Sequence, residues 1–501
     1  MHTIEEQLVK EQEMLRAIRA YMEGDALSEE LHAVEEGLHR RLLDLGRLLL
    51  EEVVLRRDER DVGQTCRHGG VVRQRYSEGK RAYLSIFGAI SIKRAYYWDK
   101  DQGGHYPLDA ALNLPERSIS YLLQQWIQKR VTRGAYGEAI EDIEELLGLQ
   151  LPKRTHEQIT DEASQEVVSF YEDRQAPAVE TEGAVIAVQA DGKGVRMVRA
   201  DQPEQKQDQS SPRRNKGEKP GLRRMAVATA DYSFDPEPRT PEHMVTLLMK
   251  QQTKEELAQL RQERRQRRQW GQEDPRIPLN AHIEATMAGK EAAFTQLAVR
   301  VRQRDPTGLK PIAVLLDGEK ALEKQIRFAF RKAGLWPRVD AVILDIIHAM
   351  EYLWEAGTAL HGEKGNKRMP WVRQQALAIL QGRVGYVIGG LRRTRTRRAD
   401  RLSAAQKRTL EKVSTYFDNH KHMMRYDQYL AKGYPIGTGM IEGTCRSLVK
   451  DRMDISGAKW THSGAEALLK LRAVKKNGHW KDYWDYYIAR NKQRLYDVSN
   501  N

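Results

Sequence analysis

The sequence predicts a multidomain protein whose central part is an α/β domain, preceded by a helical segment and a small β-rich module. Three observations lead to this fold class. The chain has 501 residues, enough for roughly two to four domains. Short apolar runs typical of strands buried on both faces occur after residue 180. Apolar residues at helical spacing precede and follow those runs.

The N-terminal third is predicted to contain three modules. Residues 1–60 are helical, with apolar residues such as Leu42, Leu45, Leu49 and Val53 at near-helical spacing. We expect this helical segment to serve packing or self-association rather than DNA contact. Residues 61–115 form a β-rich module, because VVRQRYS and RAYLSIFGAISIKRAYYW read as short strands joined by Gly-containing turns.

Residues 116–178 are predicted to be helical again. One helix ends at Gly148, and the next begins after LQLPK with Thr155 as its cap. A helix, a short turn and a second helix are the outline of a helix-turn-helix DNA-binding region, although any helical hairpin shares that outline.

Residues 179–350 form the first part of the α/β domain. Its expected strands are AVIAVQAD, MAVATADY, PIAVLLD and VDAVILD, with helix over 240–305 that includes a polar, Arg/Gln-rich middle. Residues 351–431 read as helices only. Residues 432–501 contain a further helical segment over 438–455.

Composition points to a soluble protein with a polyanionic partner. Hydrophobic residues make up 40% of the chain and charged residues 31%, which excludes a disordered chain. No apolar run approaches the ~18 residues that span a membrane, and no secretory signal is present, so we expect a cytoplasmic protein. The net charge is +13, and basic residues gather at 211–224 and 391–401. Such runs are often only solvated, but two of them favour phosphate contact.

Two acids follow predicted strands. Asp191 and Asp317 each end an apolar run and precede a glycine. Open α/β sheets place their sites at such strand ends. An ordinary Asp-Gly turn is the alternative for either residue taken alone.

A third acid lies on a predicted helix within GYPIGTGMIEGTCRSLVKDRMD. Ile441, Cys445, Leu448 and Val449 form an apolar stripe that would dock on a sheet, so Cys445 is a core residue rather than a nucleophile. Along the neighbouring edge run Glu442, Arg446 and Lys450. Their alternative role is that of surface ion pairs.

Together the three acids suit phosphodiester chemistry. Two hard cations about 3.5–4 Å apart stabilise the charge on the attacking and leaving oxygens. Mg²⁺ or Mn²⁺ prefers oxygen ligands, and two or three carboxylates suffice. Arg446 and Lys450 would then lie where a phosphate backbone approaches.

The order of two strand-Asp-Gly elements followed by GTGMIEGTCRSLVKDRMDISGAKW resembles the ISKra-type insertion-sequence transposases. These are bacterial DDE enzymes related to the Mutator-like and hAT-like groups. LDIIHAMEYLWEA, with Asp345 and His348, resembles a further element of those groups. The resemblance runs from about residue 60 to the end and is strongest from residue 311.

This resemblance implies a ribonuclease-H-like α/β core with an all-helical insertion over about 351–431. It implies that Asp191, Asp317 and Glu442 hold two catalytic metal ions, supported by Asp345 and His348. It implies cleavage at element ends and strand transfer into target DNA by a homo-oligomer, a dimer or larger. The partners are double-stranded DNA with terminal inverted repeats and the target DNA. DNA contacts are expected from the residues Arg446, Lys450, Arg452, Lys459 and Trp460, where Trp460 would stack on an unpaired base or else lie in the core.

The chain departs from this family in its β-rich module, where paired cysteines of a small zinc ribbon are expected. Only Cys66 is present there, with His68 and His105 nearby, and four ligands at zinc spacing are absent. We therefore expect no structural zinc. Cys66 and Cys445 are too far apart in sequence to indicate a disulfide framework.

Two other functions fit the same residues. One is a transposase-derived DNA-binding protein without catalysis. The other is a structure-specific nuclease on the same fold. Metal-dependent strand transfer would separate the transposase from both.

Overall fold

The computed structural model describes residues 4–201, 223–252, 258–259, 261–262, 265–266 and 278–497. The chain divides into two compact units, Met1–Asp173 with Gly478–Asn501, and Arg174–Asn477. The last helix, α20 (Trp480–Tyr496), belongs to the first unit.

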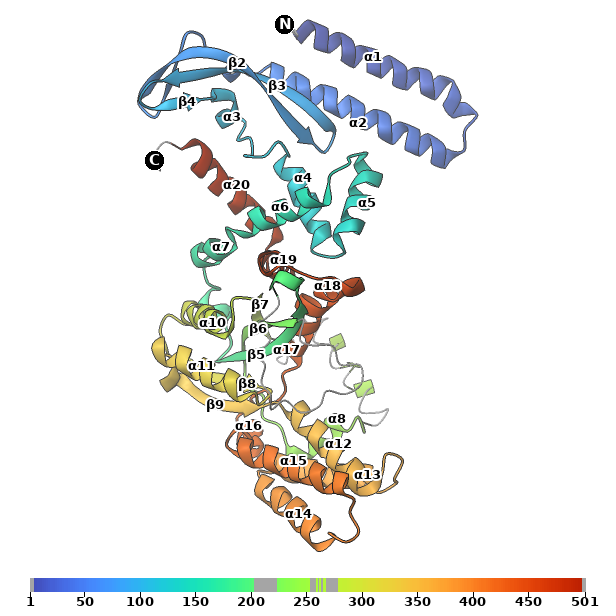
Figure 1. The fold of residues 1–501 in the computed structure, drawn as a ribbon, viewed down its shortest axis with the longest axis vertical. Helices are drawn as coiled ribbons and strands as arrows, with labels where there is room; N and C mark the ends of the chain where they lie inside the picture. The colour runs from blue at the N-terminus through green and yellow to red at the C-terminus, as the bar shows by residue number, and fades with distance from the viewer. Residues whose placement is uncertain are drawn as a thin grey trace. The chain divides into compact units, whose positions relative to one another are not determined.

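The first unit begins with a helical hairpin and a small sheet (Figure 1). Helix α1 (Ile4–Glu23) packs on α2 (Leu31–Leu55). The antiparallel sheet follows, in the order β1 (Thr65–His68), β2 (Val71–Ser85), β3 (Gly88–Asp99) and β4 (Gly103–His105). Val54 of α2 joins Ile90 and Ile92 of β3 in its core. The β-rich module expected over 61–115 is therefore present.

Short helices complete the first unit: α3 (Pro107–Ala111), α4 (Tyr121–Val131), α5 (Tyr136–Leu147), α6 (Lys153–Ser164) and α7 (Val167–Asp173). Helix α5 ends at Gly148, which adopts the left-handed conformation as expected. Helix α6 begins earlier than expected, with Pro152 rather than Thr155 at its N-cap. Buried hydrogen bonds join α4, α5 and α6, because Thr160 Oγ1 donates to Gln128 Oε1 (2.9 Å) and Tyr136 Oη donates to Thr160 Oγ1 (3.2 Å).

The second unit is built on a five-stranded mixed sheet in the order β7-β6-β5-β8-β9 (Figure 1). The strands are β5 (Val185–Arg196), β6 (Arg223–Phe234), β7 (Leu279–Thr286), β8 (Ile312–Leu316) and β9 (Val339–Leu344). Neighbours β5, β6 and β7 are antiparallel, whereas β8 and β9 run parallel to β5. All five residues of β8 are buried, as a central parallel strand requires.

The prediction of helix over 240–305 is wrong in part. That stretch contains α8 (Pro241–Leu248), then strand β7, then α10 (Lys290–Arg304). Strand β7 is half exposed at the sheet edge, so its sequence, LNAHIEAT, lacks the apolar run that marked the central strands. Much of the Arg/Gln-rich middle and residues 211–222 of the first basic stretch lie outside the described residues.

One helix connects the last two strands of this sheet, and the helices after β9 form the segment over about 351–431 that was expected to be all-helical. Helix α11 (Lys320–Lys332) lies between β8 and β9, and α12 (Ile346–His361) follows β9. After it come α13 (Arg368–Leu380), α14 (Val384–Arg397), α15 (Ala404–His420) and α16 (Tyr426–Ala431). The chain then returns through α17 (Gly439–Thr444), a π-helical turn (Cys445–Lys450), α18 (Asp451–Met453) and α19 (His462–Lys476).

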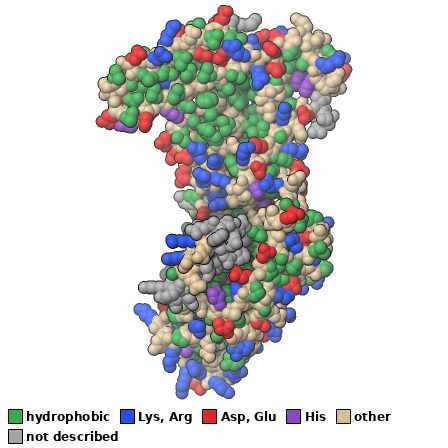
Figure 2. All heavy atoms as spheres, turned by 180° about the vertical axis from the view of Figure 1, so that it is seen from behind, with side chains coloured by type: hydrophobic (Ala, Val, Ile, Leu, Met, Phe, Trp, Pro, Cys, Tyr) green, Lys and Arg blue, Asp and Glu red, His purple; other side chains and the backbone are tan. Residues whose placement is uncertain are grey.

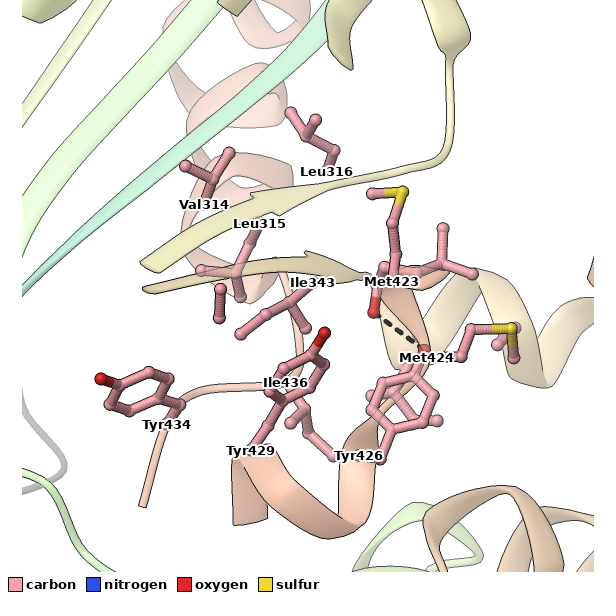
Figure 3. Close-up of a cluster of buried hydrophobic side chains, with 14 of the residues drawn as sticks. Val314, Leu315, Leu316, Ile343, Met423, Met424, Tyr426, Tyr429, Tyr434 and Ile436 are labelled. Atoms are coloured by element: carbon pink, nitrogen blue, oxygen red, sulfur yellow. Dashed lines mark hydrogen bonds between the residues drawn. The ribbon is translucent and has the colours of Figure 1, made fainter. Parts of the chain in front are cut away.

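Helix α16 covers the free edge of β9 (Figure 3). The Tyr426 hydroxyl donates to the Leu344 carbonyl (2.9 Å), and the Tyr429 hydroxyl donates to the Val342 carbonyl (3.1 Å). Ile436 and Met423 pack in the same buried cluster as Ile343 of β9. The segment over 351–431 is therefore anchored to the sheet at the strand that precedes it.

Candidate functional site

Strand register brings three aspartates to adjacent positions at the carboxyl ends of the parallel strand pairings. Ala190 of β5 pairs with Leu316 of β8, and Leu316 pairs with Leu344 of β9. The next residues along these parallel strands are Asp191, Asp317 and Asp345. Neighbouring strands lie about 4.8 Å apart, so the three residues follow one another across the sheet.

Asp191 does not end a strand, contrary to the sequence-based expectation. Strand β5 continues to Arg196 because β6 pairs with it on the other side, with Asp191 opposite Ala228. Only the parallel pairing with β8 ends at Ala190. At Asp191, strand β5 is therefore no longer paired with β8 but is still paired with β6. This leaves Asp191 half-buried beside the end of β8.

The turn after Asp317 is held by helix α15. The Tyr416 hydroxyl donates to the Asp317 carbonyl (2.9 Å), and His420 Nε2 bonds to the Gly318 carbonyl (2.8 Å). Gly318 has φ +94°, and a Cβ there would come within 2.8 Å of the Tyr416 oxygen and 2.9 Å of a Leu344 methyl group. Only glycine fits that left-handed, crowded position.

Glu442 is positioned by two buried side chains of the sheet. Gln189 on β5 accepts from the backbone N–H of Ile441 (2.9 Å) and donates to the Tyr232 hydroxyl (3.1 Å). Asp345 is fully buried, and it accepts from the Thr438 hydroxyl (2.6 Å) and the Thr438 backbone N–H (3.2 Å). Helix α17, which carries Glu442, is thus tied to β5 and to the end of β9.

Asp345 also caps α12, because its Oδ1 accepts from the Ile347 N–H (3.0 Å). Three of the roughly four acceptor positions of a carboxylate are therefore used. Asp345 is a positioning residue by this geometry. His348, one turn further along α12, remains about one-third exposed and contacts Glu351 (3.3 Å).

The expected apolar stripe after Glu442 is present, but on a π-helical turn rather than a regular helix. Ile441, Cys445, Leu448 and Val449 are all buried, whereas Glu442 is exposed. The Cys445 thiol forms a hydrogen bond with Asp191. Burial, the charge of Asp191 and this hydrogen bond together raise the pKa of Cys445. Cys445 is a core residue, as predicted. π-Helical turns occur often at functional sites.

The acids repel one another electrostatically. Burial and, to a lesser extent, the charge of Asp191 raise the pKa of Asp317 above its ordinary value. Burial raises the pKa of Glu442 as well, with contributions from the charges of Asp345 and Asp191. His348 lowers the pKa of both Asp317 and Glu442. The five side chains therefore lie near one another, and four of them are acids.

This cluster suits a divalent cation. Ligand atoms of Asp345, His348 and Glu442 lie within 4.8 Å of one another, the one such triplet in the described part of the chain. The sequence had grouped Glu442 with Asp191 and Asp317 instead. The structure places Glu442 within ligand distance of the supporting pair, while Asp191 and Asp317 follow the last paired residues of β5 and β8. Carboxylates with raised pKa values favour a bound cation because it relieves their repulsion.

The residues expected to contact DNA separate into two groups. Arg446, Lys450 and Lys459 are exposed. Arg452 and Trp460 are buried, with 1% and 6% of their surfaces exposed. Burial contradicts the DNA contact predicted for Arg452, and Trp460 takes the alternative position in the core. The guanidinium of Arg452 lies over the Trp460 ring (4.9 Å), and the Trp460 indole N–H donates to the Met453 carbonyl (3.0 Å).

Several residues of the site could not be identified from the sequence. Gln189, Thr438, Tyr416 and His420 act through contacts between segments more than 90 residues apart in the chain. Only Gln189, a polar residue inside an apolar run, carried a signal. Lys193 is also new: it stands two residues after Asp191 on β5 and so shares its face of the strand.

The second basic stretch forms the end of α14. Arg392 and Arg395 pair with Asp418 and Glu411 of α15. The exposed arginines of the stretch with no ion pair among the described residues are Arg393, Arg397, Arg398 and Arg401. Basic side chains are visible around the lower end of the molecule in Figure 2, the end where α14 lies in Figure 1. This stretch therefore offers cations to solvent.

The β-rich module holds its cysteine in its core. Cys66 is buried with Ala95 and Tyr97. The rings of His68 and His105 stack at 3.8 Å, and burial, together with the neighbouring His68, lowers the pKa of His105 to about 4. Within the described residues, these side chains do not form a triplet of metal ligands.

Part of the chain is similar to a protein family. Residues 27–209 match UPF0236, an uncharacterised protein family. The matched segment contains Asp191 and ends before Asp317 and Glu442. Curated proteins yield no match. Among the described helices, none combines the length and the apolar character needed to cross a lipid bilayer.

Proposed function

We propose that this chain is a DDE-type DNA transposase with a ribonuclease-H-like catalytic core. The observation that carries the proposal is that Asp191 and Asp317 follow paired residues of adjacent parallel strands, and that the charges of Asp191 and of Asp345, at the end of the next strand, both act on Glu442. The five-stranded mixed sheet supports it too. So do the helices inserted between β9 and the Glu442 helix, as the resemblance to ISKra-type transposases implies.

In this proposal Asp191, Asp317 and Glu442 hold two Mg²⁺ or Mn²⁺ ions. His348 is close enough to Glu442 to act as a further ligand. Such ions would stabilise charge on the attacking and leaving oxygens of a phosphodiester. The donor set fits, since it offers mostly carboxylate oxygens whose mutual repulsion a cation relieves.

The remaining residues of the site hold the segments that carry the acids in position. Asp345 and Gln189 hold the start of the Glu442 helix, while Tyr416 and His420 hold the turn after Asp317. These buried contacts fix the acids relative to one another before DNA arrives, which lowers the cost of assembling the site.

Two exposed cations and one partly buried lysine lie near the acidic cluster. Lys193, Arg446 and Lys450 flank it on β5 and on the segment after Glu442. They would hold the phosphate backbone against the carboxylates, which by themselves repel it. DNA is therefore the substrate that we propose for this site.

The test uses the full chain with Mn²⁺ and a plasmid that carries the DNA flanking its own gene. Asp317→Asn is expected to lower cleavage by about 10²–10⁴-fold and to leave DNA binding intact. Exposed Asp400→Asn is the matched control and should cleave like the unaltered chain. Joining of the cut ends to target DNA supports a transposase, and cleavage without joining supports a nuclease. Cleavage that persists in Asp317→Asn refutes the assignment.

A further inference from the structure

Helix α2 carries apolar side chains on three of its sides, and two of those sides are covered. One side packs on α1, where Gln7 Nε2 donates to the Leu48 carbonyl (2.8 Å). Another side packs on the small sheet. There Gly46 lies so close to Phe87 that a Cβ would come within 2.6 Å of its ring, and Val54 joins the core of the sheet.

The third side of α2 is open. Leu31, Leu42, Leu49 and Val53 are 74%, 55%, 45% and 52% exposed. At 3.6 residues per turn these four share one narrow sector of the helix with Leu38 and Leu45, which are half-buried. We name these six residues the α2 stripe: Leu31, Leu38, Leu42, Leu45, Leu49 and Val53.

The hairpin partner widens this apolar face. On α1, Leu15 and Met22 are 48% and 51% exposed. Helical periodicity places them on the flank of α1 that adjoins the α2 stripe. A continuous exposed face of this kind marks an interaction site, whereas scattered exposed leucines do not.

Charge at the two ends of the stripe identifies its partner. Glu35 lies in the same sector near the N-terminal end of α2, and Arg56, the C-cap residue, lies in it at the other end. Arg56 pairs with Glu52 of its own helix (2.6 Å), and Glu35 has no ion pair among the described residues.

An antiparallel second copy of α2 matches this pattern at two pairs of apolar positions and one pair of charged positions. With the twofold axis between Leu45 and Gly46, Leu42 faces Leu49 of the second copy. Glu35 then faces Arg56 of the second copy, and the same contact repeats on the other side of the axis. A twofold interface requires such a self-complementary surface.

We propose that the α2 stripe is an interface between two copies of this chain, with the two α2 helices antiparallel. The interface buries leucines at the spacing of a helix-helix seam and closes it with two symmetric Glu35–Arg56 ion pairs. This proposal does not depend on the catalytic proposal, because it concerns a different unit of the chain and needs no DNA.

The first experiment measures the mass of the full chain in solution, without DNA or metal, by sedimentation at several concentrations. The unaltered chain is expected to be a dimer at micromolar concentration. Leu42→Glu with Leu49→Glu should weaken the dimer by more than about 100-fold. Leu309→Glu, at an 83% exposed leucine of the other unit, is the matched control and should remain dimeric.

The second experiment tests the antiparallel register and uses only exposed positions, so folding is not at risk. Glu35→Arg and Arg56→Glu should each weaken self-association by roughly ten-fold, because each variant places like charges in both symmetric pairs. A mixture of the two variants should associate as well as the unaltered chain, since opposite charges meet again at both ends. The double variant Glu35→Arg/Arg56→Glu should also recover the dimer.

Three results would overturn the proposal. A monomeric unaltered chain would mean that some other segment or a different protein covers the stripe. A dimer that survives Leu42→Glu with Leu49→Glu would place the interface elsewhere. Failure of the mixed charge variants to associate better than either alone would reject the antiparallel pairing.

Discussion

The hydrogen bond from Thr438 to Asp345 sets the position of the Glu442 helix, and replacing Thr438 by valine removes it. Valine has nearly the shape of threonine and lacks only the hydroxyl. Asp345 is fully buried and the Oγ1–Oδ2 distance is 2.6 Å, so the variant strips the shortest of three hydrogen bonds from a carboxylate that water cannot reach.

The size of the effect follows from that burial. A hydrogen bond to a charged group contributes about 1.5–3 kcal/mol, so we expect Thr438→Val to lower the free energy of unfolding by about 2 kcal/mol. The melting temperature of the second unit, which spans Arg174–Asn477, should fall by roughly 3 °C. Cleavage should fall by about 10–100-fold, because only the backbone N–H of residue 438 still ties the Glu442 helix to Asp345.

Thr438→Ser is the matched control. It keeps the hydroxyl and loses only a methyl group, so its unfolding free energy should fall by less than about 1 kcal/mol. Calorimetry of the three proteins gives the stability difference, and a cleavage assay gives the activity. If the valine and serine variants melt together and cleave alike, the hydrogen bond does not position the helix and the reasoning is refuted.

Two further predictions concern charge. Since burial and Asp191 raise the pKa of Asp317 in the folded chain, the stability that its protonated form provides is lost as the pH rises through that pKa. With a chelator present, Asp317→Asn should therefore be more stable than the unaltered chain at pH ~7 and equal to it below about pH 3.8, the ordinary pKa. Denaturant unfolding at both pH values measures this, and equal stabilities at neutral pH would contradict it. Arg446→Ala with Lys450→Ala should flatten the salt dependence of DNA binding by about one unit of slope per lost phosphate contact. Lys324→Ala with Lys332→Ala on α11 should leave the slope unchanged, and equal slopes in both pairs would reject the phosphate contacts.

The central strands could be predicted because burial on both faces leaves a plain apolar run. PIAVLLD gave β8 together with Asp317, and VDAVILD gave β9 together with Asp345. Edge strand β7 was not predicted, because a strand at the edge of a sheet tolerates polar residues and so lacks an apolar run. Asp191 was placed at a strand end because Asp-Gly suggests a turn, and the antiparallel partner β6, which carries β5 onward, cannot be inferred from that dipeptide.

The acids of the site were predictable as residue types in order, but their supports were not. Gln189 and Thr438 matter through partners far away in the chain, and local patterns do not encode such pairs. The same limit explains why DNA contacts were predicted for Arg452 and Trp460. A basic and an aromatic residue near a catalytic segment suggest DNA contact, whereas here they stack on each other inside the unit.

Titration of the full chain with Mn²⁺, followed by electron paramagnetic resonance, tests most directly whether the acidic cluster binds metal ions. We expect two ions to bind per chain. Asp191→Asn, Asp317→Asn and Glu442→Gln should each abolish or weaken binding of at least one ion, while Asp400→Asn should bind like the unaltered chain. Absence of binding, or binding that none of the three substitutions alters, would contradict the proposed catalytic site.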